Sequence, residues 1–268
     1  MVNRASIGQF IVKKRSIVPN IITMLNMTLG FFAIIYAARG DANSLAIAGV
    51  LIFIGSLCDA SDGAVARAMH VESPVGLQLD SLADGIAYGI APAVIAYQAF
   101  LSKLPEVGSG VGLGMIIAPI YPICAIYRLA RFNVESEEEG KGGFTGLPSP
   151  AAGIVVSAVP TLFPVLPFFG NVQFLAPVAA FLKSNPFFVP LYLFTAFLMV
   201  SHVDYSKLFY DIYKKGRIAT IITVLLIIIL LIFFRMWSVF AVTMMYIVLG
   251  MIGFFIKIVL NKSKHDEK

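Results

Sequence analysis

Long apolar stretches dominate the sequence and confine it to a fold that is solvated by lipid. A helix crosses a bilayer with about 20 consecutive, mostly apolar residues. Inside the bilayer no water is available to the backbone, so each span must satisfy its own hydrogen bonds, as a helix does. The pattern therefore predicts an all-α, polytopic membrane bundle of about eight transmembrane helices. The predicted spans are residues 19–38, 44–69, 76–101, 110–132, 151–169, 186–201, 218–234 and 237–259.

Composition excludes a water-soluble domain and a nucleic-acid-binding protein. The chain is 59% hydrophobic and 13% charged, whereas soluble domains are about 45–50% apolar and about 25% charged. The net charge of +5 comes from basic residues scattered over short loops. Nucleic-acid binding would require those charges to gather on one soluble face, so we expect membrane lipids, and no nucleic acid, around this chain.

Few segments lie outside the clearly predicted spans. Residues 1–18 carry four basic side chains and no small-residue cleavage site. We interpret them as a basic juxtamembrane arm rather than a signal peptide, with a disordered basic tail as the alternative. The stretch 186–201 is short, and residues 172–183 before it form either a re-entrant or interfacial helix or part of the same span. Without internal repeats or a Ser- or Gly-rich linker, residues 1–268 are expected to form a single domain.

The distribution of Lys and Arg predicts the orientation in the membrane. With a cytoplasmic N-terminus and eight spans, sixteen of the twenty basic residues fall on the cytoplasmic side. Cytoplasmic loops carry such an excess of positive charge. We therefore expect both termini in the cytoplasm.

Four aspartates interrupt two adjacent spans, and they are the strongest chemical signal in the sequence. Asp59 and Asp62 are separated by three positions, and Asp80 and Asp84 by four, so each pair projects from one helix face. The short connection between the two spans brings both pairs to the same cytoplasmic edge. A charge at membrane depth costs about 2.5–3.5 kcal/mol or more, and the one nearby arginine, Arg67, cannot neutralise four acids. Mg²⁺ or Mn²⁺, and two ions for four carboxylates, would resolve the repulsion.

The same region resembles the signature of a known enzyme family. The letters Asp59-x2-Asp62-Gly63-x2-Ala66-Arg67-x8-Gly76-x3-Asp80-x3-Asp84 are similar, without a gap, to the motif of the CDP-alcohol phosphotransferases. The resemblance extends over residues 19–201 and implies a catalytic core of six spans. A cytoplasmic loop at 202–217, two additional helices within 218–259 and a cytoplasmic tail at 260–268 would follow. The last two spans are almost purely apolar, which is typical of structural or oligomeric helices.

The resemblance implies an activity and a set of site residues. Family members transfer a phosphatidyl-type group from a CDP-linked lipid to an alcohol and release CMP, and they are usually homodimers. Asp59, Asp62 and Asp80 would be metal ligands, and Asp84 would be both a ligand and the general base. Contacts to the CDP-lipid are implied at Asn20, Thr23, Gly63, Arg67 and Ser73. Helix capping remains an alternative role for Asn20 and Thr23, and a turn position before Pro74 for Ser73.

The identity of the acceptor alcohol depends on weaker signals. Residues 88–93, 127–133 and 144–150 together resemble the membrane-integral phosphatidylserine synthases, a branch of the family whose acceptor is L-serine. Arg128 and Arg131 lie one turn apart at a cytoplasmic helix end, where an arginine would bind a serine carboxylate with two parallel hydrogen bonds. Both side chains could instead extend to the interface as ordinary helix-end arginines.

Several other functions compete with serine transfer. The two arginines would equally suit the phosphate of a glycerol-phosphate or inositol-phosphate acceptor. Intramembrane prenyltransferases also bind a metal diphosphate through aspartates, but their two acidic motifs are far apart, whereas 17 residues separate Asp62 from Asp80 here. A cation transporter predicts paired repeats and helices broken near mid-membrane, which the sequence lacks. The nature of the lipid chains, acyl or isoprenoid ether, is left open.

Overall fold

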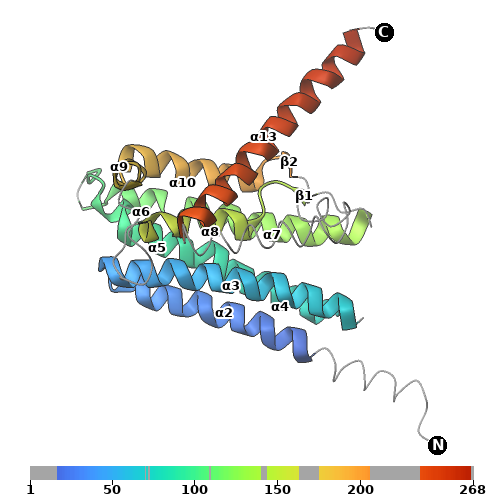
Figure 1. Ribbon diagram of the computed structural model, residues 1–268, viewed down its shortest axis with the longest axis horizontal. Helices are drawn as coiled ribbons and strands as arrows, with labels where there is room; N and C mark the ends of the chain where they lie inside the picture. Colours follow the sequence, from blue (N-terminus) through green and yellow to red (C-terminus); the bar gives the residue numbers. More distant parts are fainter. Residues whose placement is uncertain are drawn as a thin grey trace, which may run out of the picture.

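The protein is a bundle of membrane-length helices in which most helices lie along one common axis (Figure 1). The structure is a computed structural model that describes residues 17–69, 71, 73–108, 110–139, 144–162, 175–205 and 236–266. The basic arm up to residue 16, the predicted span 218–234 and most of the loop 202–217 lie outside these residues.

Five segments of the described chain are long and apolar enough to cross a membrane, and they coincide with five predicted spans. The third is a composite of an α-helix, a π-helix, an α-helix and a final 3₁₀ turn. The fourth consists of a short helix and a long one. In chain order the elements are α2 (Ile17–Ala38), α3 (Ala42–Met69), α4 (Pro74–Asp84), η1 (Gly85–Ile90), α5 (Ala91–Ala99), η2 (Leu101–Lys103), α6 (Leu113–Ile117), α7 (Ile120–Glu139) and α13 (Met236–Asp266). The prediction of a polytopic helical membrane protein is confirmed.

The remaining helices are less regular than the sequence pattern predicts. Helix α8 (Ser149–Thr161) has 13 residues, and the described segment ends soon after it. Helices α9 (Ala176–Leu182) and α10 (Asn185–Val200) meet at an angle of 62°. The predicted span 186–201 therefore corresponds to α10, and the helical part of residues 172–183 bends away from it. Counting the bent pair as one span gives up to six spans in the described chain.

One short β-pairing supplements the helices. Strand β1 (Phe144–Thr145) pairs antiparallel with β2 (Asp204–Tyr205), and Phe144 stands opposite Tyr205. The pairing joins the segment before α8 to the segment after α10. The sequence did not predict it, because two residues carry no periodic pattern.

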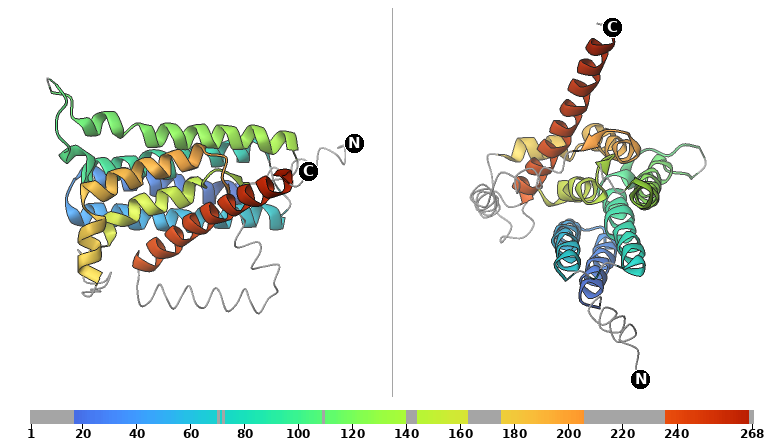
Figure 2. Two further views of the ribbon diagram at one scale, coloured as in Figure 1. Left: turned by 90° about the horizontal axis from the view of Figure 1, so that it is seen from above. Right: turned by 90° about the vertical axis from the view of Figure 1, so that its right-hand side faces the viewer.

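Successive helices alternate in direction, which gathers several chain segments at one end of the bundle. The turn between α3 and α4 and the end of α7 lie at the right-hand end of Figure 1, and the start of α8 and the end of α10 lie nearer the middle, beside β1 and β2. Viewed end-on, the α4–η1–α5 segment lies between the α2–α3 pair and the group of α7, α8 and α10 (Figure 2). The centre of this arrangement is η1, which contacts α2, α7 and α8.

Small residues allow the close approach of these helices. An added Cβ atom at Gly30 on α2 would lie 2.7 Å from the Cα atom of Ala87 in η1. One at Gly153 on α8 would lie 3.2 Å from the Cα atom of Tyr88. Lipid gives helices no hydrophobic reason to associate, so close backbone packing at small residues supplies much of the attraction. Gly30 and Gly153 thus hold η1 between α2 and α8.

Candidate metal centre and active site

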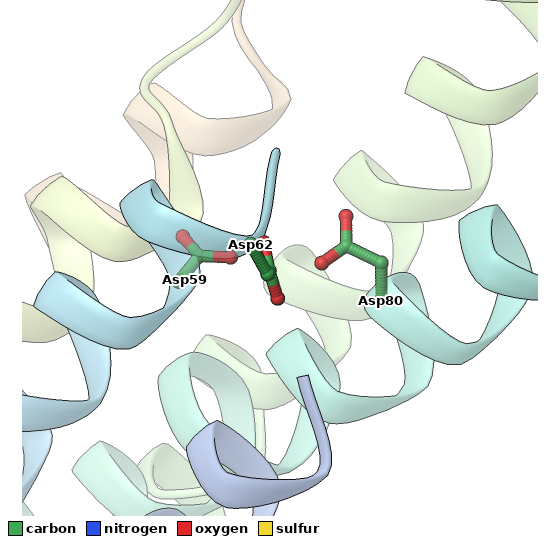
Figure 3. A group of neighbouring side chains, drawn as sticks. All are labelled: Asp59, Asp62 and Asp80. Carbon is green, nitrogen blue, oxygen red and sulfur yellow. The ribbon is translucent and has the colours of Figure 1, made fainter. Parts of the chain in front are cut away.

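Three carboxylates meet where α3 and α4 approach their common turn. Asp59 and Asp62 project from α3, and Asp80 projects toward them from α4 (Figure 3). One oxygen of each side chain can be chosen so that all three lie within 4.8 Å of one another. The short connection between the two spans thus brings acids of both spans together. We refer to Asp59, Asp62 and Asp80 as the carboxylate triad.

The triad has the properties of a site for a hard cation. Asp62 is buried, and Oδ1 of Asp80 is buried without a hydrogen-bond partner. In the described part of the chain, no lysine or arginine forms an ion pair with these carboxylates. Clustered carboxylates repel one another and are poorly solvated at this depth. An oxygen-binding divalent cation would relieve both effects, so the residues fit a metal site.

Asp84 lies one turn deeper than Asp80 and has a different environment. Its side chain is only 7% exposed and is adjacent to that of Asp59, but it is not one of the triad's mutually close ligands. The Nδ2 atom of Asn26 on α2 donates to Oδ1 of Asp84 at 3.4 Å, and the hydroxyl of Tyr88 donates to Oδ1 of Asn26 at 3.2 Å. Asn26 and Tyr88 are both fully buried. This hydrogen-bonded chain fixes the orientation of the Asp84 carboxyl.

The predicted CDP-lipid contacts on α2 and α4 lie beside the triad. Thr23 donates from Oγ1 to Oδ2 of Asp62 at 2.6 Å. An added Cβ at Gly76 would lie 3.3 Å from Oδ1 of Asn20 and 3.1 Å from Oγ of Ser73, so these two side chains converge there. Oγ of Ser73 also accepts a hydrogen bond from the Gly76 amide at 3.0 Å and caps α4, as the turn alternative predicted.

The other two predicted CDP-lipid contacts lie on α3, beyond Asp62. The guanidinium of Arg67 lies over Gly63, with Nη1 3.3 Å from the position that a Cβ of Gly63 would occupy. Arg67 is exposed. Its charge is therefore available to a ligand at the open edge of the triad.

Arg128 and Arg131 occupy different surroundings although they are one turn apart. Arg128 is 5% exposed, and its Nη1 donates to Oγ of Ser149 at 3.2 Å. Its Nε atom is buried without a partner. The guanidinium is close enough to Asp84 and Asp59 to interact electrostatically with both. Arg128 is therefore a buried cation within electrostatic range of Asp84 and Asp59, with unused hydrogen-bonding capacity.

Arg131, by contrast, uses its donors on the protein backbone. Its guanidinium donates to the carbonyl oxygens of Val200, Thr145 and Ser201 at 3.1, 2.9 and 3.2 Å. Its Nε also forms an ion pair with Glu135 at 3.6 Å. These contacts tie α7 to the end of α10 and to β1. The structure does not bring Arg131 to the acidic cluster through any contact of the described residues.

Three residues of this region were missed at the sequence level: Asn26, Tyr88 and Ser149. Asn26 carried a usable signal, because it is a polar residue within an apolar span, three positions after Thr23 and on the same helix face. Tyr88 and Ser149 lie in the stretches 88–93 and 144–150 that resemble the serine-transfer branch, but the sequence assigned neither of them a role. Their roles depend on the packing of η1 and α8 against other helices.

Fold and site together define an integral membrane protein with a cluster of carboxylates that fits a divalent metal. The family model for CDP-alcohol phosphatidyltransferases matches residues 16–184. The chain belongs to this family and is an enzyme of the CDP-alcohol phosphotransferase type. The resemblance inferred from the aspartate motif is thereby confirmed.

One relative extends the similarity to nearly the whole chain, and others match part of it. A Helicobacter pylori (strain 26695) protein named CDP-diacylglycerol–serine O-phosphatidyltransferase is 31% identical over 254 residues, which are 92% of this chain and 95% of the relative. A Mycobacterium leprae protein of the same name is 35% identical over 52% of this chain, and that alignment spans only 45% of the relative. An archaetidylserine synthase of Methanothermobacter thermautotrophicus is 32% identical over 59% of this chain and 61% of the relative.

Proposed function

We propose that this enzyme transfers a phosphatidyl-type group from a CDP-linked lipid to the hydroxyl of L-serine and releases CMP. The relatives named for serine transfer support the acceptor, one of them over nearly the whole chain. The observation that carries the proposal is the position of Arg128, a buried cation with a free Nε beside Asp84. A serine carboxylate bound there would bring its hydroxyl near the acidic cluster.

The carboxylate triad would hold the divalent metal, Mg²⁺ or Mn²⁺, and two ions would match the four acids when Asp84 contributes. Asp59 and Asp62 would bind from α3, and Asp80 from α4 through the oxygen that now lacks a partner. When bound, such ions neutralise the diphosphate of the donor and the charge that develops as CMP leaves.

The chain's own residues would bind the donor and move the proton. Arg67 at the open edge suits the diphosphate, while Asn20, Thr23, Gly63 and Ser73 would contact the remainder of the CDP group. Asp84 accepts the proton of the serine hydroxyl. As it does so, a bond forms between the serine oxygen and the lipid-side phosphorus, and the bond from that phosphorus to the CMP oxygen breaks. General-base assistance of this kind contributes roughly 10²–10⁴ in rate.

The arginine pair divides into two roles under this proposal. Arg128 binds the acceptor carboxylate, because it is buried beside Asp84 and retains a free donor. Arg131 supports the acceptor site indirectly, since backbone carbonyls already engage its donors. The alternative of interfacial snorkelling does not suit Arg128, which is only 5% exposed.

We further propose a cytoplasmic active site, both termini in the cytoplasm, a single domain over residues 1–268 with its catalytic core at 19–201, and a homodimer. The positive-inside distribution of basic residues supports the orientation. The triad lies near the α3–α4 turn, which this orientation places in the cytoplasm.

An acceptor panel tests the proposal. Purified protein is incubated with a CDP-lipid, Mn²⁺ or Mg²⁺, and labelled serine, glycerol phosphate or inositol phosphate in separate reactions. Label should enter the lipid fraction from serine alone. Incorporation from a phosphorylated acceptor instead of serine would contradict serine transfer and would assign Arg128 to a phosphate.

A further inference from the structure

The C-terminal helix reaches the region of Arg128, although it lies beyond the 16–184 segment that matches the family model. Helix α13 packs against α8 and crosses β2 obliquely (Figure 1). Gly250 permits this approach, because an added Cβ there would collide with the ring of Tyr205. The rings of Tyr205 and Tyr246 have centroids 5.5 Å apart. Residues of β2 and α13 thus form a tyrosine pair at the contact between the two elements.

This tyrosine pair adjoins the buried arginine. Tyr246 is close enough to Arg128 for an electrostatic interaction, and Arg128 in turn is hydrogen-bonded to Ser149 on α8. Helix α13 also packs against α8, the helix that carries Ser149, so α8 brings the tyrosine pair and Arg128 into the same part of the bundle. Asp84 too lies within electrostatic range of Arg128.

Arg128 and Tyr205 each have a buried polar atom without a hydrogen-bond partner. Five buried side-chain atoms of the described residues have no hydrogen-bond partner, and Nε of Arg128, the hydroxyl of Tyr205 and Oδ1 of Asp80 are three of them. Buried polar groups in proteins are nearly always paired, and a buried charge without a partner is costly. Two free hydrogen-bond donors, one of them on a buried cation, would suit an anionic ligand.

The chemical nature of these two hydrogen-bond donors favours a carboxylate as the ligand. A guanidinium and a phenol both donate to carboxylate oxygens. Burial raises the pKa of Tyr205 to about 12, so its hydroxyl stays protonated and able to donate at neutral pH. A phosphate is larger than a carboxylate. The phosphate of a sugar-phosphate acceptor would therefore fit less easily against the rings of Tyr205 and Tyr246.

We propose that Tyr205 and Tyr246 complete the acceptor pocket around Arg128 and help bind the carboxylate of the acceptor, an inference that rests on the proposed transfer to serine. The C-terminal helix then has a part in acceptor selection as well as in structure.

Phenylalanine substitutions test the pocket, because they keep the rings and remove only the hydroxyls. In Tyr205→Phe and Tyr246→Phe, the KM for serine should rise about tenfold, as expected for loss of a hydrogen bond to a charged group. The KM for the CDP-lipid and kcat should stay unchanged. Tyr127→Phe is the matched control, because Tyr127 neighbours Arg128 in sequence but is 58% exposed.

A second acceptor separates ligand recognition from a structural effect. Ethanolamine has the hydroxyl and the amine of serine but no carboxylate, so the preference of the enzyme for serine over ethanolamine should fall about tenfold in the tyrosine variants. Equal serine KM values in the wild-type and both tyrosine variants would overturn this inference and leave serine transfer intact. A parallel loss of activity with both acceptors would also overturn it. Absence of serine transfer by the wild-type protein would overturn the proposed function and this inference with it.

Discussion

At the scale of single residues, the acids near the α3–α4 turn divide into a triad open to a cation and one deeper carboxyl. Asp59, Asp62 and Asp80 have oxygens within 4.8 Å of one another. Asp84 instead receives a hydrogen bond from Asn26, which is itself bonded to Tyr88. The division suggests metal binding for the triad and proton transfer for Asp84.

Removal of one triad carboxylate should abolish activity without unfolding the protein. Asp59→Asn and Asp80→Asn should each reduce transfer by roughly a thousandfold or more, because several kcal/mol of transition-state stabilisation by metal are lost. In excess chelator the same variants should melt at or above the wild-type temperature, because one repulsive charge is gone. Glu106→Gln, an exposed acid in a loop, is the control and should remain active. Full wild-type activity in chelator would refute the metal assignment.

Asp84 and its support should affect turnover more than donor binding. Asp84→Asn should lower kcat by roughly 10²–10⁴, and Asn26→Ala should lower it less, since the carboxyl remains but loses its orienting donor. CDP-dependent thermal shifts in Mg²⁺ should persist in both variants. If Asp84→Asn loses CDP binding to the extent of Asp59→Asn, then Asp84 acts only as a metal ligand.

Lysine substitutions at the two arginines should affect different properties of the enzyme. Arg128→Lys keeps the charge but loses the planar fork, so the KM for serine should rise roughly ten- to a hundredfold. Arg131→Lys should mainly lower thermal stability, by an amount on the order of 2 kcal/mol, since it loses contacts to three backbone carbonyls. Kinetics and melting curves of both variants check the assignment. An unchanged serine KM in Arg128→Lys would place the carboxylate elsewhere.

At the scale of elements, η1 is the segment on which the site depends. It follows Asp84 directly, contains Tyr88 and packs against α2, α7 and α8. Short π-helical segments within longer helices are often found at functional sites. The contact of η1 with α2 explains how Asn26, on a helix without an acid, comes to bond both Tyr88 and Asp84.

A side chain at the contact between α2 and η1 should disturb both stability and activity. An added Cβ at Gly30 would lie 2.7 Å from backbone of Ala87, so Gly30→Ala must push the elements apart, at a cost of about 1–3 kcal/mol. Gly253→Ala on α13 is the control, because no neighbouring atom lies within 4 Å of its added Cβ. Thermal unfolding in detergent compares the two. Equal stability of both variants would show that the α2–η1 contact tolerates expansion.

Sequence patterns predicted these elements unevenly, for physical reasons. Length and hydropathy located α2 and α3 to within two residues, because a lipid solvent imposes both on every span. The 62° bend between α9 and α10 and the pairing of β1 with β2 depend on tertiary contacts. The same holds for the site: the spacing of the aspartates revealed the triad, whereas only packing distinguishes Arg128 from Arg131.

At the scale of the whole molecule, the alternating helices bring the α3–α4 turn and the end of α7 to one end of the bundle (Figure 1). Helices α3 and α4 carry the acids, and α7 carries the buried Arg128. The C-terminal helix α13 approaches the same region through Tyr246. Membership of the CDP-alcohol phosphatidyltransferase family explains the cluster of aspartates and the CDP-lipid donor. Arg128 and the pair of Tyr205 and Tyr246 are the residues from which we infer the acceptor.

Release of CMP by the purified enzyme tests this account most directly. In the presence of a CDP-lipid, CMP should form only when serine and a divalent cation are both added, and each CMP should accompany one serine incorporated into lipid. Chelation of the metal or omission of serine should each reduce the release to background. CMP release that is independent of serine, or that continues at full rate in chelator, would contradict it.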